Sequence, residues 1–154
     1  MKHQILSAIA AIVLFASCSK TASDTTMSSD VIVPSSSVPS SIVSGFTADN
    51  SKASELEWRK GTDDKFKVHF NADDKRVESK LDDNGRTTAS RVVSDKAVPK
   101  AVLDAFAANF PGETVYEWKH RSDGTWRAHF NRSGVKWEAT FSASGTLLKA
   151  EKSA

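Results

Sequence analysis

The stretch that decides the fold runs from Val98 to Lys149 and reads VPKAVLDAFAANFPGETVYEWKHRSDGTWRAHFNRSGVKWEATFSASGTLLK. Much of its pattern also stands sixty positions earlier in the chain, and no insertion is needed to align the two. The matched residues are Trp118, His129, Phe130, Asn131, Glu138 and Gly145, which follow Trp58, His69, Phe70, Asn71, Glu78 and Gly85. A fixed period of this length indicates a duplicated supersecondary unit.

Each unit is predicted to begin with a helix and to continue with strands. Val38-Pro39 and Val98-Pro99 stand before the two helices, and proline suits a first helical turn. Val102, Phe106 and Phe110 recur every four residues and form one apolar stripe. Apolar and polar residues then alternate through four segments, which indicates strands with one buried face. We therefore predict an α+β fold of two tandem repeats, each with one helix packed on a four-stranded antiparallel sheet.

The apolar face of each predicted sheet is expected to pack against its helix, so that the tryptophans are core residues rather than a ligand cage. In the second repeat this face comprises Tyr116, Trp118, Trp126, Ala128, Phe130, Trp137, Ala139, Phe141, Leu148 and Ala150. In the first repeat it comprises Leu56, Trp58, Phe66, Val68, Phe70, Val77 and Leu81.

Composition divides the chain into four parts: a signal peptide (1–17), a Ser/Thr-rich tether (18–30), and two repeats (31–93 and 94–154). The apolar run Ile5–Phe15 is too short for the roughly 20 residues of a membrane span, as in signal peptides. Phe15-Ala16-Ser17-Cys18 resembles a bacterial lipobox, in which the cysteine becomes lipidated. The alternative is an ordinary secretory signal that is cleaved nearby.

Overall composition excludes several classes of protein. Of 154 residues, 39% are hydrophobic and 26% are charged, as in ordinary globular domains, and the net charge of +2 is too small to indicate nucleic-acid binding. One cysteine rules out an intramolecular disulfide framework and a cysteine-rich zinc site. The chain has no phosphate-binding glycine loop, no nucleophile elbow and no zinc-protease motif. We therefore expect a protein that is not an enzyme and has no cofactor.

The predicted turns align charged residues across the polar face of each sheet. A turn at Ser122–Gly124 places Glu117 opposite His129, and a turn at Ser133-Gly134 places His129 opposite Glu138. The same offsets predict a first row of Glu57, His69 and Glu78, with Arg91 beside Glu78. Each row has two interpretations: a metal or proton site, or a cross-strand charge ladder worth roughly 0.2–1 kcal/mol per pair. The flanking carboxylates are expected to raise the pKa of His129 above about 6.5.

A basic row is predicted beside each of these rows. It comprises Arg59, Lys67 and Lys80 in the first repeat, and Lys119, Arg127 and Lys149 in the second. It is either a docking face for an acidic protein or anionic envelope polymer, or an ordinary solvated surface. The candidate binding face therefore consists of Glu57, Arg59, Lys67, His69, Glu78, Glu117, Lys119, Arg127, His129 and Glu138. No catalytic residue and no metal ligand is assigned.

One part of the sequence resembles the PepSY-like, β-lactamase-inhibitor-like domains of bacterial envelope proteins. It begins at Val98-Pro99, continues through Asn109-Phe110-Pro111-Gly112 and ends at Tyr116-Glu117-Trp118. The resemblance covers about Val31 to the C-terminus and is carried by the pattern, so it transfers no functional residue. It implies a secreted or anchored, non-enzymatic binding module. The cysteines of the β-lactamase inhibitory protein are absent here, so its disulfides cannot form.

Together these observations predict a lipid-anchored protein of the bacterial cell envelope, facing the periplasm or lying in the outer membrane. It is expected to dock a protein partner, in an inhibitor-like manner, on the helix-free faces of its sheets. The alternatives are a small-ligand or metal binder that uses the Glu–His–Glu rows, and a purely structural envelope protein.

Overall fold

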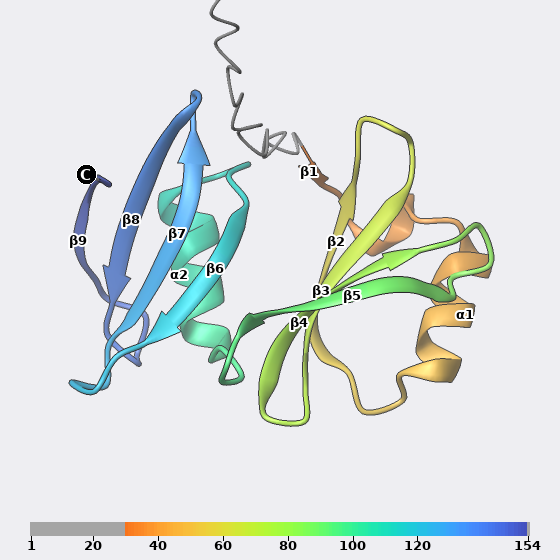
Figure 1. Cartoon of the computed structure of the whole chain (residues 1–154), viewed down its shortest axis with the longest axis horizontal. Coiled ribbons are helices and arrows are strands. Elements are labelled where there is room, and N and C mark those ends of the chain that lie inside the picture. Colours follow the sequence, from red (N-terminus) through yellow and green to blue (C-terminus); the bar gives the residue numbers. More distant parts are fainter. Residues whose placement is uncertain (1–29, 154) are drawn as a thin grey trace, which may run out of the picture.

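A computed structural model describes residues 30–153 of the chain. The first part contains β1 (Val31–Ile32), a 3₁₀ turn η1 (Ser35–Ser37), α1 (Ser40–Asp49), β2 (Ser54–Lys60), β3 (Phe66–Ala72), β4 (Lys75–Leu81) and β5 (Thr87–Ser94). The second part contains α2 (Lys100–Asn109), β6 (Val115–His120), β7 (Trp126–Arg132), β8 (Val135–Phe141) and β9 (Leu147–Lys152). Figure 1 shows the two parts side by side, with β5 next to β6.

The strands form two antiparallel sheets of unequal size. The first has five strands in the order β1-β2-β3-β4-β5, and the second has four in the order β6-β7-β8-β9. The predicted fold class, two repeats of one helix on four strands, is therefore wrong. The extra strand arises because Val31 and Ile32 pair with Lys60 and Arg59 at the edge of β2. The matching positions sixty residues later lie within β5 and pair with β4 instead.

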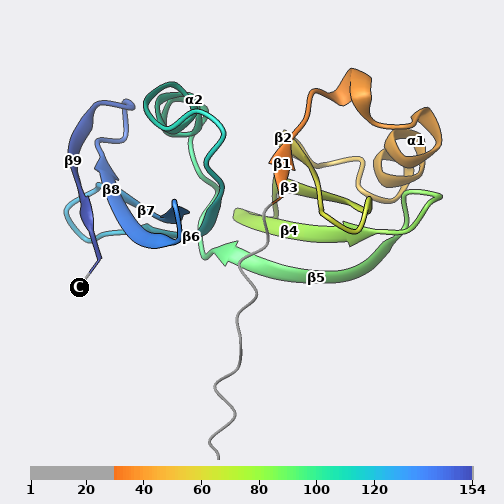
Figure 2. The same ribbon diagram turned by 90° about the horizontal axis from the view of Figure 1, so that it is seen from above.

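Both helices lie on the same side of the two sheets (Figure 2). As predicted, each begins directly after a proline, Pro39 or Pro99. Phe46 of α1 is fully buried, and its ring centroid lies 5.6 Å from that of Trp58. Phe106 of α2 is likewise buried, with its ring centroid 5.7 Å from that of Trp118. The chain thus has two aromatic cores, each between a helix and the facing sheet.

Most of the predicted inward-facing residues are confirmed, but Ala150 is exposed on the edge strand β9, and three others do not face the core. Leu56 and Leu148 are exposed, and the ring of Tyr116 lies near that of His129 on the side of its sheet away from α2. Each of the three lies where the pairing register shifts. A β-bulge inserts one extra residue, so the alternation of side chains between the two faces is interrupted. The sequence pattern assumed an unbroken alternation and therefore placed these side chains on the wrong face.

Within residues 30–153, no helix is long and apolar enough to cross a membrane. The predicted signal peptide, Cys18 and residues 18–29 of the tether lie outside the described residues. The predicted division between residues 93 and 94 stays a prediction.

Candidate functional site

The two charged rows form with the predicted register. In the first sheet, Glu57 lies opposite His69, and His69 lies opposite Glu78. In the second sheet, Glu117 lies opposite His129, which in turn lies opposite Glu138. The turns therefore fix the neighbours as the sequence indicated. The two rows differ, however, in burial and in the hydrogen bonds that they make.

The row of the first sheet is buried rather than solvent-exposed, contrary to the prediction of a polar outer face. His69 is 1% exposed, and its Nε2 lies 2.6 Å from Oε2 of Glu78. The guanidinium of Arg91 donates to both oxygens of the same carboxylate, from Nε at 2.8 Å and from Nη2 at 3.0 Å. A carboxylate held by three nitrogen atoms of two side chains is a structural element of the sheet.

A second set of contacts extends this cluster toward the segment that leads to α2. The Nε atom of Arg59 donates to Glu57 at 2.7 Å. Arg76 is 1% exposed and donates from Nη1 to the side-chain oxygen of Asn71 at 3.2 Å. The amide nitrogen of Asn71 donates to the backbone oxygen of Val98 at 2.9 Å. The face of the first sheet is thereby tied to the chain segment that precedes α2.

The pKa values of the cluster follow from burial and from the balance of charge. Burial and the neighbouring Arg59 lower the pKa of His69 to about 4, although Glu78 and Glu57 act in the opposite direction. Burial alone would raise the pKa of Glu78, but its hydrogen bonds with His69 and Arg91 lower it well below its usual range. Three arginines already face two glutamates in this cluster, so a protonated His69 would add excess positive charge.

The row of the second sheet is more open and less well paired. The Nδ1 atom of His129 lies 3.7 Å from Glu138, too far for a hydrogen bond, and the Tyr116 ring centroid lies 6.2 Å from that of His129. Glu138 instead pairs with Nη1 of Arg127 at 2.8 Å. Lys119 pairs with Glu117 at 3.4 Å on the same face. These are partly exposed ion pairs, which contribute little to stability.

The pKa of His129 is lowered rather than raised, so that prediction was wrong. Burial is the largest cause, and it outweighs the opposing effect of Glu138 and Glu117. Burial also raises the pKa of Tyr116, with Glu117 and Glu138 acting in the same direction. The sequence-based prediction considered the neighbouring carboxylates but omitted the desolvation of the imidazole.

Several polar atoms on the second face are buried without a hydrogen-bond partner, among them Nε2 of His129 and Oδ1 of Asn131. The corresponding atoms of the first sheet have partners, because Nε2 of His69 bonds to Glu78, and Oδ1 of Asn71 accepts from Arg76 and from the backbone N–H of Val98. A buried polar group without a partner costs about 1–3 kcal/mol. Among the described residues, the second face thus has three such atoms, counting Nε of Arg127, whereas the first sheet has one, Nε of Arg76.

Of the predicted basic rows, the second one is the accessible one. Arg59 is 3% exposed, and Lys67 is largely buried with its Nζ 2.8 Å from Asp30. Lys119 and Lys149 are exposed, while Arg127 is partly exposed. The candidate face predicted for the first sheet is thus mostly enclosed, and that of the second sheet is open.

Three residues of the second face were missed by the sequence analysis: Tyr116, Asn131 and Glu151. Glu151 lies opposite Glu138, where the first sheet has Arg91 opposite Glu78. The sixty-residue offset from Arg91 could have identified Glu151, and the offset from Asn71 could have identified Asn131. The bulge that turns Tyr116 outward had no visible signal in the sequence.

No group of three histidine, cysteine, aspartate or glutamate side chains within residues 30–153 is arranged to hold a metal ion. The Glu–His–Glu rows therefore carry no argument for a metal centre.

Comparisons with known proteins give limited information. No family model matches the chain, and no curated protein matches it either. Three solved structures are similar: DUF2874 family proteins from Bacteroides uniformis and Bacteroides ovatus, and a candidate periplasmic protein from Bacteroides eggerthii. Each is 16% identical with a TM-score of 0.34, covering 74–75% of this chain and 86–88% of the neighbour. A similarity this low carries no argument about fold or function, and none of the three is named PepSY-like or inhibitor-like.

Proposed function

We propose that this chain is a lipid-anchored protein of the bacterial cell envelope and acts as a non-enzymatic module that binds a protein partner. The helix-free face of the second sheet, made of the outward side chains of β6 to β9, is the docking surface. The proposal of an anchor is supported by the N-terminal sequence, in which the apolar run Ile5–Phe15 leads to Cys18.

One observation supports the choice of the second sheet as the docking surface. The matched Glu–His–Glu row is buried and hydrogen-bonded in the first sheet, but partly exposed and less well paired in the second. In the first sheet His69 and Glu78 are buried and bonded to each other. In the second sheet the Nε2 atom of His129 is buried without a partner, and exposed charged residues surround it. A partner that covers this face can supply the missing hydrogen bonds and exclude water from the charged pairs.

The composition of the second face also suits protein recognition. Tyr116 is partly exposed and lies next to His129, with the two ring centroids 6.2 Å apart. Arg127 is partly exposed on the same face and pairs with Glu138. Aromatic residues and arginine are enriched in protein interfaces, because they combine a large apolar surface with hydrogen-bonding groups.

Charge reversal on the second face tests this proposal. The bait is the full chain in detergent micelles, and it is used to capture proteins from solubilised envelopes of the same source. We expect the double variant Lys119→Glu and Lys149→Glu to lose the captured partner at least tenfold, because both lysines are exposed on this face.

The matched control is the double variant Lys52→Glu and Lys80→Glu, which makes the same change of charge at exposed positions in the first part of the chain. It should keep the captured partner. Equal loss in both double variants, or loss in neither, would show that the second face is not the docking surface.

A further inference from the structure

An edge of the second sheet lacks the strand that covers the corresponding edge of the first. In the first sheet β1 pairs with β2 through Val31 and Ile32, and the backbone nitrogen of Val33 donates to the Trp58 oxygen at 3.0 Å. The pairs that join β2 to β3 recur sixty residues later between β6 and β7, including Trp118 with Ala128. The edge of β6 at Trp118 to His120 therefore corresponds to the covered edge of β2.

No backbone hydrogen bond joins β5 to β6 among the described residues, although the C-terminal end of β5 lies next to β6 (Figures 1 and 2). The residues that match β1, Arg91 and Val92, are paired with β4 instead. The side chain of Arg91 makes one contact across the gap, from Nη1 to the backbone oxygen of Tyr116 at 3.0 Å. The β6 backbone beyond Tyr116, toward His120, is left unpaired on this side.

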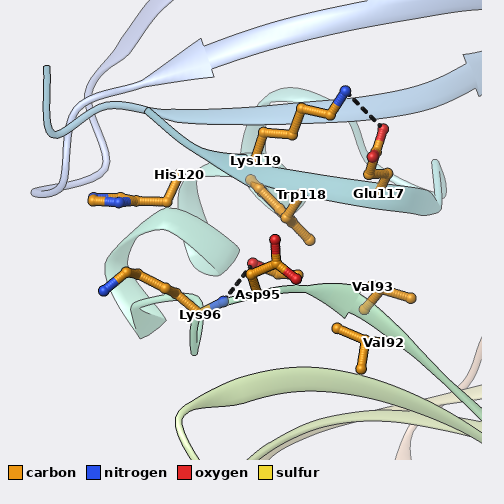
Figure 3. Close-up of a pocket in the computed structure, with 9 residues that line it drawn as sticks. Val92, Val93, Asp95, Lys96, Glu117, Trp118, Lys119 and His120 are labelled. Carbon is orange, nitrogen blue, oxygen red and sulfur yellow. Dashed lines mark hydrogen bonds and ion pairs between the residues drawn. The ribbon is translucent and has the colours of Figure 1, made fainter. Parts of the chain in front are cut away.

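A cleft of about 490 Å³ lies beside this unpaired backbone. Val92, Val93, Asp95 and Lys96 line one side, and Glu117 to His120 line the other (Figure 3). One residue of a strand occupies roughly 160 Å³, from its rise of about 3.3 Å and spacings of about 4.8 and 10 Å. The cleft therefore has room for about three extended residues, the length of Val31 to Val33.

The charged residue of β7 at the position that matches Lys67 of β3 indicates which residue would precede a segment bound in the cleft. In the first sheet Asp30, just before β1, pairs with Lys67 at 2.8 Å. The position that matches Lys67 is Arg127, whose Nε atom is buried without a hydrogen-bond partner. The position that matches Asp30 is Ser90, which is paired with Ser79 inside the first sheet. An acidic side chain from outside would complete the hydrogen bonding of Arg127.

We propose that the free edge of β6 binds an extended segment of the partner protein, in which an acidic residue precedes two or three β-branched residues. The segment adds as a short strand, antiparallel to β6, in the cleft between β5 and β6. Strand addition of this kind uses backbone hydrogen bonds for affinity and side chains for specificity. The inference rests on the proposed function, since it takes the ligand to be a protein, but it concerns the edge of the second sheet rather than its face.

A partner protein suits this edge better than a second copy of the chain. Within residues 30–153 this pattern occurs at Asp30 to Val33, which is engaged with β2 and Lys67, and at Glu113 to Val115, where Val115 is paired with Phe130 of β7. A second copy would have to release one of these segments before it could offer it.

The test uses a peptide with the sequence Ser-Asp-Val-Ile-Val-Pro, that of residues 29–34, blocked at both ends and carrying a fluorescent label. Binding to the full chain in detergent micelles is followed by fluorescence anisotropy. The variant His120→Pro removes a backbone N–H on the free edge while leaving the pairing with β7 in place. We expect it to weaken binding at least tenfold, whereas His120→Ala, which keeps the N–H, should stay within about twofold.

The role of Arg127 is tested by a double-variant cycle. Replacing the aspartate of the peptide by asparagine should weaken binding to the native chain about tenfold, as expected for one charge-assisted hydrogen bond. The same replacement should have little effect on Arg127→Gln. In the native chain, the peptide should also slow hydrogen exchange at the amides of Trp118 and His120, a readout that does not depend on the folding of a variant.

The possible results distinguish a failure of strand addition at the β6 edge from a failure of the proposed function. Absence of peptide binding, unchanged exchange at these two amides, or equal affinity for His120→Pro would overturn the inference. If capture of the partner still depends on Lys119 and Lys149, the proposed function stands although strand addition at β6 is refuted. If the chain forms dimers that the peptide dissociates, the edge binds a second copy, and the assignment to a partner protein is wrong.

Discussion

The buried histidine of the first sheet predicts how stability changes with pH. The imidazole of His69 is 1% exposed and bonded to Glu78, and it lies among three arginines and two glutamates. Burial and Arg59 lower its pKa to about 4. In the unfolded chain its pKa is about 6.5. Between these values the unfolded chain binds a proton that the folded chain does not.

The sign and the size of the effect follow from this difference. Because the pKa of His69 is lower in the folded state, its contribution is fully present above about pH 6.5 and is lost as the pH falls toward 4. With these two pKa values, the free energy of unfolding should decrease by about 2 kcal/mol between pH 7 and pH 5. Glu78 adds little in this interval, because its pKa is lowered and its own loss begins at more acidic pH.

Two measurements on the full chain check this prediction. NMR titration of the His69 ring should show no protonation above pH 5. Urea unfolding at pH 7 and pH 5, followed by the amide signals of β3, should give the loss of about 2 kcal/mol. His69→Gln, which keeps an N–H to donate to Glu78, should remove most of that loss, while His129→Gln should not. A His69 ring that titrates at or above pH 6.5, or an equal pH dependence in His69→Gln, would refute the argument.

Three further predictions concern the core, a turn and the anchor. Phe106→Ala should lower the free energy of unfolding by about 3–5 kcal/mol and the exposed Leu148→Ala by less than about 0.5, as measured in urea; a cost below about 1 kcal/mol for Phe106 would contradict the packing. Gly85 and Gly134 have similar φ angles of +79° and +76°, but an added Cβ would meet a backbone oxygen of α1 at 2.1 Å only at Gly85. Urea unfolding should therefore show a cost of about 1 kcal/mol for Gly134→Ala and of more than about 2 for Gly85→Ala, and similar costs would contradict the close approach. Cys18→Ala should leave the protein soluble or unprocessed, and a variant that still fractionates with membranes would contradict the lipid anchor.

The sequence could predict neighbours across the sheets, because turn positions and alternation are local properties. The pairing of Glu117 with His129 follows from the turn at Ser122–Gly124 and is confirmed. The outward position of Tyr116 could not be predicted, since a bulge is a single-residue change in register with no compositional signal. The predicted number of strands in the first sheet was wrong for a related reason. A two-residue strand such as β1 forms because the neighbouring strand β2 has a free edge, and not because of a pattern in its own sequence.

Burial of the polar face was the other property that the sequence could not supply. His69 and His129 stand in the same pattern of neighbours, yet the first lies in a bonded, enclosed cluster and the second beside exposed charges. Alternation assigns a side chain to a face, but it does not say what covers that face. The cover of the first sheet includes the segment at Val98, which is joined to Asn71 by a hydrogen bond across 27 residues of sequence.

The difference between the two rows comes from a few exchanges at matched positions. Arg91 donates to Glu78 from two nitrogen atoms, whereas the matching Glu151 lies opposite Glu138 and can donate nothing to it. The first row is thereby neutralised inside the protein, and its charges stabilise the sheet. In the second row the three carboxylates pair with cations that are partly or fully exposed, Lys119, Arg127 and Lys149, and Glu138 also accepts from the Ser153 hydroxyl. Since like charges opposite each other in a sheet are destabilising, a ligand that places a donor between Glu138 and Glu151 would gain binding energy that the first sheet has already used for folding.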